Sequence, residues 1–286
     1  MTTVEVPNAS NKEITFVLFD PGRQILKKVK FDKSFEELSE QLIHTPQMID
    51  RYDALLALKS FPVDQKRDLL IHCFSKESFH LNKSEVISQL AGDSDLKTID
   101  MIKKAIHDED VYVRRAVVQN ILSIPEEVKK DCETLLTDLS YINVELALAN
   151  LVSSFPSEAD RYFEITKHEE GWRGKNIRIK WLELAVGLGK KEHLDELIRY
   201  SSKSYEFETR QNALMALKRL NYLDNRVAEN LLDAAIYWNY KLVNTAKEVI
   251  NFFKQQTEGK ARLTSCLNNM TLSKEDYELL KKMINF

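Results

Sequence analysis

A repeat of 31 to 33 residues runs through this chain of 286 residues and constrains its fold more than any other feature. Each unit has an anchor residue followed by mostly apolar residues three, four and seven positions later, the spacing of one face of an α-helix. The seven anchors are Arg51, Lys83, Arg114, Glu145, Arg178, Arg210 and Lys241. One helix per repeat, with room for a second between anchors, predicts an all-α fold: an α-solenoid of about seven two-helix repeats of the HEAT/armadillo-like type.

The residues between the anchored stripes predict the partner helices. Ser34 and Glu37 form a capping-box pattern at the start of the first one. The partner helices are expected at about 35–43, 63–74, 96–107, 126–139, 158–168, 192–202, 226–238 and 260–268. A last helix at 274–284, with Lys and Glu on its outer face, is expected to cap the stack. We therefore assign residues 32–286 to one α-solenoid domain.

The first 31 residues have a different composition. Segments 4–6, 14–19 and 25–31 are rich in β-branched and aromatic residues, and the sequence Asp20-Pro21-Gly22-Arg23 between the last two favours a tight turn. This pattern predicts a β-hairpin segment over residues 1–31. Because a lone hairpin is marginally stable, we expect it either to be the remnant of an upstream β-sandwich or to dock on the first helices.

Composition narrows the class of partner. The formal charge is −3, with acids and bases interleaved, so binding to nucleic acid is not expected. No apolar run approaches the roughly 20 residues that span a bilayer, so no membrane span is expected. Cys73, Cys132 and Cys266 lie far apart and are interpreted as small buried apolar residues. The compartment is left open between cytoplasm and periplasm.

The chain lacks the usual sequence patterns of a reactive centre. Its six histidines form no H-E-x-x-H pattern and no pair at helical spacing, and no nucleophile elbow or phosphate-binding loop occurs. We therefore predict no catalytic residue, no metal ligand and no cofactor in this chain.

One loop interrupts the repeat and provides the candidate binding residues. Trp172, Arg173, Lys175 and Arg178 combine an aromatic ring with cations beside permissive glycines, which is typical of functional loops. They are candidate substrate contacts from the loop or from a concave face. The interpretation we favour for this loop is nevertheless a solvated connector in which Trp172 packs back on the solenoid.

The recurrent arginines also have two interpretations. In stacked helix pairs an arginine can reach a carbonyl or an acid of the neighbouring unit, and Asp50, Asp108, Asp110 and Glu208 are suitable partners. The functional alternative places these arginines on a concave surface that holds an anion. The aromatic residues Phe207, Tyr237, Trp238, Tyr240, Phe252 and Phe253 are interpreted as helix-packing residues.

The N-terminal region resembles a known junction between domains. Residues 19–31 (FDPGRQILKKVKF), followed by Glu36-Glu37-Leu38, Gln41-Leu42 and residues 48–55 (MIDRYDAL), resemble the passage from the β-sandwich into the C-terminal helical domain of aminopeptidase N-type zinc exopeptidases of the bacterial branch. The sharp part of this resemblance covers about forty residues. The rest agrees only in being HEAT/armadillo-like.

The resemblance implies a non-catalytic domain. In that family the helical domain encloses the active-site chamber and limits the access of peptides. The expected partners are therefore the upstream catalytic and β-sandwich domains of the same polypeptide, together with the peptide substrate. Zinc would belong to the parent catalytic domain, because the H-E-x-x-H motif is missing here.

Two other functions remain open. The first is a stand-alone α-solenoid scaffold for protein interaction, including the aminopeptidase-like subunits of transcription initiation complexes. The second is a HEAT-repeat enzyme that acts on nucleic acid, such as an alkylbase glycosylase, against which the nearly neutral charge argues.

Overall fold

The repeat forms helix pairs in the structure, a computed structural model that describes residues 13–285. This part of the chain contains sixteen α-helices and four short 3-10 helices, and no strand. By contacts the chain divides into two compact units, Met1–Asp131 and Cys132–Phe286, with the division inside helix α7 (Lys129–Thr134). The all-helical fold class predicted from the sequence is confirmed.

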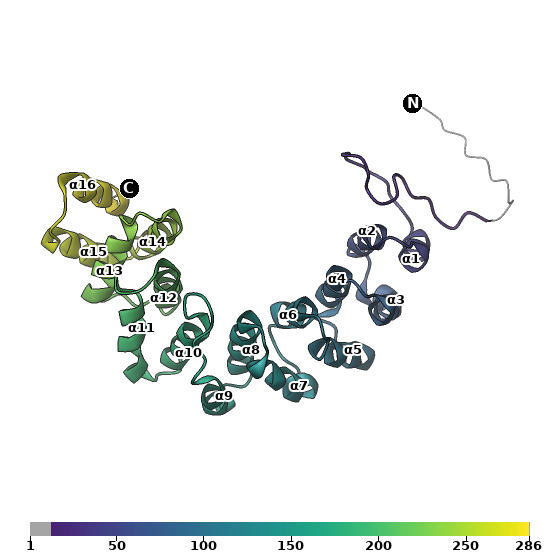
Figure 1. The fold of residues 1–286 in the computed structure, drawn as a ribbon, viewed down its shortest axis with the longest axis horizontal. Coiled ribbons are helices and arrows are strands. Elements are labelled where there is room, and N and C mark those ends of the chain that lie inside the picture. Colours follow the sequence, from purple (N-terminus) through teal and green to yellow (C-terminus); the bar gives the residue numbers. More distant parts are fainter. Residues whose placement is uncertain (1–12, 286) are drawn as a thin grey trace. The chain divides into compact units, whose positions relative to one another are not determined.

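The first unit consists of three helix pairs. The first helices are α1 (Phe35–His44), α3 (Val63–Lys76) and α5 (Leu96–Ile106), and the second helices are α2 (Met48–Leu58), α4 (His80–Leu90) and α6 (Val111–Asn120). Helix α4 packs between α2 and α6, so the second helices form one continuous row, while α3 packs against α1 and α5 in the other row (Figure 1). A 3-10 turn, η1 (Glu126–Val128), follows.

The second unit continues the same pattern. Its row of second helices is α8 (Tyr141–Ser154), α10 (Asn176–Gly187), α12 (Phe207–Arg219) and α14 (Tyr240–Phe253), each packed on the next. The partner elements are η2 (Leu135–Thr137), η3 (Pro156–Glu158) with α9 (Ala159–Thr166), η4 (Lys191–His193) with α11 (Leu194–Tyr200), and α13 (Asn225–Ala235). Helices α15 (Thr257–Asn269) and α16 (Lys274–Asn285) follow, and α16 packs on α14 and α15.

The apolar stripe read from the sequence is the core of each pair. All predicted stripe positions are buried except Ala149, which is partly exposed. The buried positions are Ala54, Leu55, Leu58, Val86, Ile87, Leu90, Val117, Val118, Ile121, Leu148, Val152, Trp181, Leu182, Ala185, Ala213, Leu214, Leu217, Ala246, Val249 and Ile250. Burial of one recurring stripe explains why each pair needs its neighbours, since a single pair cannot cover this surface.

Local signals set the helix starts. The predicted capping box is present at α1, where Ser34 Oγ accepts from the Glu37 N–H and Glu37 accepts from the Ser34 N–H. Helix α10 begins differently, because its N-cap residue Lys175 is in the left-handed region with φ of 46°. That unusual start follows a loop with two positive-φ glycines, Gly171 and Gly174.

The predicted β-hairpin is the main error in the fold. The turn forms, with an Arg23 N–H to Asp20 carbonyl bond of 3.1 Å and Gly22 at φ of 76°. Segments 14–19 and 25–31, however, form no strand, and segment 4–6 lies outside the described residues. The turn is held on α2 instead: the Gly22 N–H donates to Asp50 Oδ1 at 2.9 Å, and Arg23 Nε donates to Asp53 Oδ2 at 2.9 Å.

Candidate functional site

The candidate loop joins α9 to α10 and is fixed in place by its neighbours. Gly174 is buried against the first turns of α12, where Asn212 Nδ2 donates to its carbonyl at 2.8 Å. Asn176, the first residue of α10, donates to Glu145 Oε2 of α8 at 2.7 Å. The loop is therefore attached to the helices on both sides of α10, and it presents its tip from a defined backbone.

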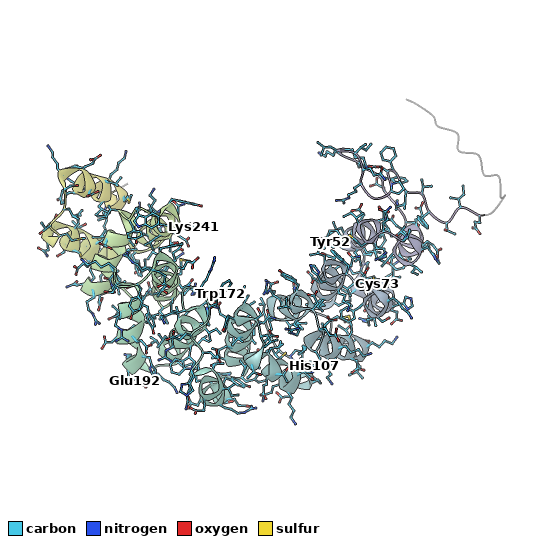
Figure 2. The ribbon with its side chains drawn as sticks, in the orientation of Figure 1. Tyr52, Cys73, His107, Trp172, Glu192 and Lys241 are labelled. Carbon is cyan, nitrogen blue, oxygen red and sulfur yellow. The ribbon has the colours of Figure 1, made fainter. Side chains whose placement is uncertain are left out.

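Trp172 and Arg173 form the exposed tip of this loop. The Trp172 side chain is 76% exposed, and the Arg173 guanidinium lies 5.0 Å from the centre of its ring. Arg173 Nη1 is also 3.8 Å from Glu208 Oε1 on α12. Within the second unit, Trp172 lies on the side where Lys241 also lies, and Glu192 lies on the opposite side (Figure 2). The expectation that Trp172 packs back on the solenoid is wrong.

Lys175 and Arg178, in contrast, are directed toward the protein. Arg178 makes two bonds to Glu196 on α11, at 3.0 and 2.7 Å, and its guanidinium lies 4.6 Å from the Trp181 ring. Lys175 pairs with Glu170 and lies 5.8 Å from the Tyr200 ring. The structure thus separates the four candidate residues into an exposed pair and a pair that anchors the loop.

Electrostatics around Arg178 support the anchoring role. Hydrogen bonds from Arg178 lower the pKa of Glu196 against the opposing effect of burial, and the Tyr200 hydroxyl adds a further bond at 2.9 Å. Burial, helped by the bond to that carboxylate, raises the pKa of Tyr200 to about 12. At neutral pH the group is therefore a salt bridge with a neutral phenol, an arrangement that fixes α10 to α11.

Further exposed aromatic and aliphatic side chains occur at the starts of two other second helices of the second unit, α8 and α14. Leu139 precedes α8, and Tyr141 is its first residue. Trp238 precedes α14, and Tyr240 is its first residue. All four are exposed, as Trp172 is before α10. The interpretation of Trp238 and Tyr240 as packing residues is wrong, although it holds for the buried Phe253. A signal was available, because Trp238 is the last residue of the predicted helix 226–238 and Tyr240 lies between that helix and the anchor Lys241.

The fit of Gly174 predicts a measurable effect of substitution. A Cβ at this residue would lie 2.5 Å from Asn212 Nδ2 and 2.8 Å from the Glu208 carbonyl carbon, at φ of 60°. We expect Gly174→Ala to reduce the free energy of unfolding by about 2 kcal/mol, measured by urea denaturation. Gly189→Ala is the control, because it shares the positive φ but meets no atom within 4 Å. Equal losses in the two variants would show that the contact with α12 contributes nothing.

The recurrent cations connect neighbouring helix pairs, as the structural interpretation predicted. Four of them reach an acid of the following pair, at 2.7 to 2.8 Å: Arg51 to Glu77, Lys83 to Asp108, Arg178 to Glu196 and Arg210 to Asp233. Arg114 donates to the carbonyls of Asp108 and Glu109 in the preceding loop, both at 2.9 Å. The predicted acids Asp50, Asp110 and Glu208 are not the partners of these four cations.

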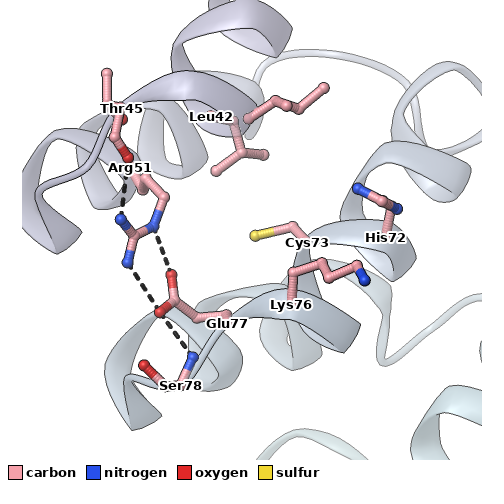
Figure 3. Close-up of a pocket in the computed structure, with 9 residues that line it drawn as sticks. Leu42, Thr45, Arg51, His72, Cys73, Lys76, Glu77 and Ser78 are labelled. Carbon is pink, nitrogen blue, oxygen red and sulfur yellow. Dashed lines mark hydrogen bonds and ion pairs between the residues drawn. The ribbon is translucent and has the colours of Figure 1, made fainter.

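A small pocket in the first unit surrounds the first of these ion pairs (Figure 3). It has a volume of about 280 Å³ and is lined by Leu42, Ile43, Thr45, Arg51, His72, Cys73, Lys76, Glu77 and Ser78. Burial raises the pKa of the Cys73 thiol to about 12, so at neutral pH the thiol is protonated. Because the thiolate is the nucleophilic form, Cys73 is an inert apolar residue, as expected.

Glu77 is the most heavily bonded acid of this pocket. It accepts two bonds from Arg51, at 2.8 and 3.0 Å, one from Asn82 Nδ2 at 2.7 Å, and the N–H groups of Ser78 and Phe79. Burial alone would raise the pKa of Glu77, but the bonds from Arg51, Asn82 and Phe79 outweigh it and hold the pKa at about 2. The carboxylate is thus a permanent anion that joins α2, α3 and α4.

Two features are absent from the described residues. No three His, Cys, Asp or Glu side chains in this part of the chain are grouped as metal ligands would be. No helix within it is both long enough and apolar enough to cross a bilayer.

The fold and the inter-repeat ion pairs define a helical-repeat protein. No protein-family model matches the chain, and no curated protein matches it. Among solved structures, the complex of CpcE and CpcF of phycocyanin lyase from Nostoc sp. PCC7120 is similar, with a TM-score of 0.50 and 13% identity over 92% of this chain and 97% of that chain. Human deoxyhypusine hydroxylase in complex with glycerol also matches, with a TM-score of 0.34, 15% identity and coverage of 86% and 94%. The first likeness supports the helical-repeat fold.

These findings correct the family assignment. The similar structure with a TM-score of 0.50 is a phycocyanin lyase complex, not an aminopeptidase, and no family model supports a zinc metallopeptidase. No described residue belongs to a strand, so the expected end of a β-sandwich is missing from residues 13–34. The short stretch from residue 19 to residue 55 resembled that family because a Pro-Gly turn followed by a capped helix is a common local solution, which does not specify a family.

Proposed function

We propose that this protein is a stand-alone helical-repeat scaffold that binds a partner protein, with the loop tip Trp172–Arg173 as the centre of the contact surface. The observation that carries the proposal is the exposure of Trp172 on a loop attached to α8 and α12. Tryptophan and arginine are the residues most enriched among those that dominate binding energy at protein interfaces. A tip that is already positioned loses little entropy on binding.

The surroundings of the tip fit a protein partner. Exposed apolar side chains also occur at the starts of α8 and α14, at Leu139, Tyr141, Trp238 and Tyr240. Isolated exposed apolar residues need no explanation, but their occurrence at the starts of three of the four second helices of this unit, with Trp172 before α10, favours a surface used for contact.

The most strongly perturbed carboxylates of the repeats have structural roles. The carboxylates with the lowest pKa values, Glu77 and Asp93, are each held by an arginine, Arg51 and Arg67 respectively. Such pairs perturb pKa values without implying catalysis. The proposal therefore requires no cofactor and no metal in this chain. The similar phycocyanin lyase structure is a complex of two proteins, which is the kind of assembly we propose here.

Phage display tests the proposal: a library of genome-encoded peptide fragments is selected for binding to the intact protein. We expect fragments selected on the wild type to bind Trp172→Ala at least 30-fold more weakly, since an interface hot spot of this kind contributes about 2 kcal/mol or more. Arg173→Ala should weaken binding less. Leu188→Ala is the control, because Leu188 is an exposed apolar residue at the other end of α10 and should leave affinity unchanged. If the selected fragments bind Trp172→Ala and the wild type with equal affinity, the proposal is refuted.

A further inference from the structure

The N-terminal arm, residues 24–33, is an irregular segment with a bend at Ile25, and its backbone has little to bond to. It runs from the turn anchored on α2 to Ser34, the N-cap of α1, so both of its ends are fixed. Within the described chain, residues 26–33 make no hydrogen bond from one backbone group to another. An extended segment with free N–H and C=O groups is a template for an additional strand.

The apolar side chains of the arm are exposed. Leu26 is fully exposed, and Ile25, Val29 and Phe31 are each about half exposed. β-branched and aromatic residues at alternating positions suit a strand that is covered on one face. The arm therefore combines unpaired backbone groups with side chains that suit a strand, and it has no neighbouring strand within the described residues.

A groove lies between this arm and the first two helices. It has a volume of about 840 Å³, and its apolar lining includes Phe19 and Val29 on one side and Leu38 and Leu56 on the other. This volume lies within the range of protein ligand sites, which is roughly 300–1,000 Å³. The groove can thus receive the side chains of a short extended peptide.

The charged side chains of the arm indicate the charge of the peptide that the groove would bind. The groove lining contains the cations Arg23, Lys27, Lys28 and Lys33 against the acids Asp50 and Asp53. Arg23 pairs with Asp53, and Lys27 pairs with Asp20. Among the described residues neither Lys28 nor Lys30 has an ion-pair partner. A second copy of the arm would bring these lysines together, which is unfavourable for strands placed side by side.

From this geometry we infer that the N-terminal arm binds an acidic, β-branched segment of a partner polypeptide by strand addition. The main-chain groups of residues 26–31 supply the hydrogen bonds, the groove accepts alternate apolar side chains, and Lys28 and Lys30 pair with acidic side chains of the partner. This site lies in the first unit and uses none of the residues of the Trp172 loop, so it is independent of the function proposed above.

Binding of a defined peptide to the full chain tests the inference. The probe is a fluorescent octapeptide in which glutamate and valine alternate, and its charge control replaces each glutamate by lysine. We expect the acidic peptide to bind by fluorescence anisotropy and the lysine peptide to bind at least tenfold more weakly. Amide hydrogen exchange of residues 26–31 should slow at least tenfold when the acidic peptide is bound.

Two variants and one control assign the effect to the arm. Val29→Pro removes a backbone donor, and Lys28→Glu with Lys30→Glu reverses the charge, so each should weaken binding at least tenfold. Lys281→Glu with Lys282→Glu makes the same charge change on exposed residues of α16 and should leave binding unchanged. Circular dichroism checks that each variant is folded.

Three results would overturn the inference. The first is failure of the acidic peptide to bind the wild type, and the second is equal binding of the two peptides. The third is a wild-type dimer in sedimentation velocity that Val29→Pro abolishes, because the arm would then pair with a second copy of this chain.

Discussion

Replacing Arg210 by alanine is expected to reduce the free energy of unfolding by about 4 kcal/mol. The side chain is 1% exposed, and it donates to the carbonyl oxygens of Ser201 and Asn230 and to Asp233, at 3.2, 3.3 and 2.7 Å. Its guanidinium also lies 5.3 Å from the ring of Tyr237. Alanine leaves a cavity between α12 and α13, and it leaves buried acceptors without donors.

Arg226→Ala is the matched control for this substitution. Arg226 pairs with Asp195 and Asp224, at 2.9 and 3.1 Å, but its side chain is more than half exposed. Exposed ion pairs contribute about 0–1 kcal/mol, so the loss should be small. Urea denaturation followed by circular dichroism measures both variants. Similar losses for the two arginines would contradict the structural role assigned to Arg210.

Glu77→Gln is expected to cost about 3 kcal/mol at neutral pH. The substitution conserves size but removes the negative charge, so the half-buried Arg51 loses its counterion and its two strong bonds. The depressed pKa of Glu77 gives a similar figure: a fall from 4.5 to about 2 corresponds to about 3 kcal/mol. Glu248→Gln is the control, because Glu248 pairs with Lys218 at an exposed site.

The pH dependence of the same variant has a definite sign. Because the pKa of Glu77 is lower in the folded state than in the unfolded chain, its contribution is complete above pH 4.5 and disappears as the pH falls toward about 2. The difference in unfolding free energy between wild type and Glu77→Gln should therefore fall to about half by pH 3. Urea titrations at pH 7, 5, 4 and 3 measure it. A difference that stays constant with pH would show that the charge of Glu77 is not the cause.

Much of the fold could be predicted because one local pattern determines it. A stripe at offsets three, four and seven from Arg51 or Arg210 specifies both a helix and its buried face. Capping signals such as Ser34 with Glu37 then mark where a helix begins. These signals are local, and a solenoid consists of local contacts, so sequence reasoning and structure agree over the helices.

The errors occur where the outcome depends on contacts distant in sequence. Segment 25–31 has the composition of a strand, but a strand also needs a partner, and the described chain provides none. The acids that receive Arg51 and Arg210 lie 26 and 23 residues further on, at positions set by how successive pairs stack. For Trp172, the sequence shows a permissive loop, but only the attachment of Gly174 to α12 explains why the ring remains exposed.

The links between successive pairs also bear on how the chain is made. Arg51, Lys83, Arg178 and Arg210 each find an acid 18 to 26 residues downstream. During synthesis, each new helix hairpin can therefore be fastened to its predecessor soon after it leaves the ribosome, without waiting for the C-terminus. A nascent chain released before completion would then keep its earlier repeats folded, and only its last hairpin would lack a neighbour.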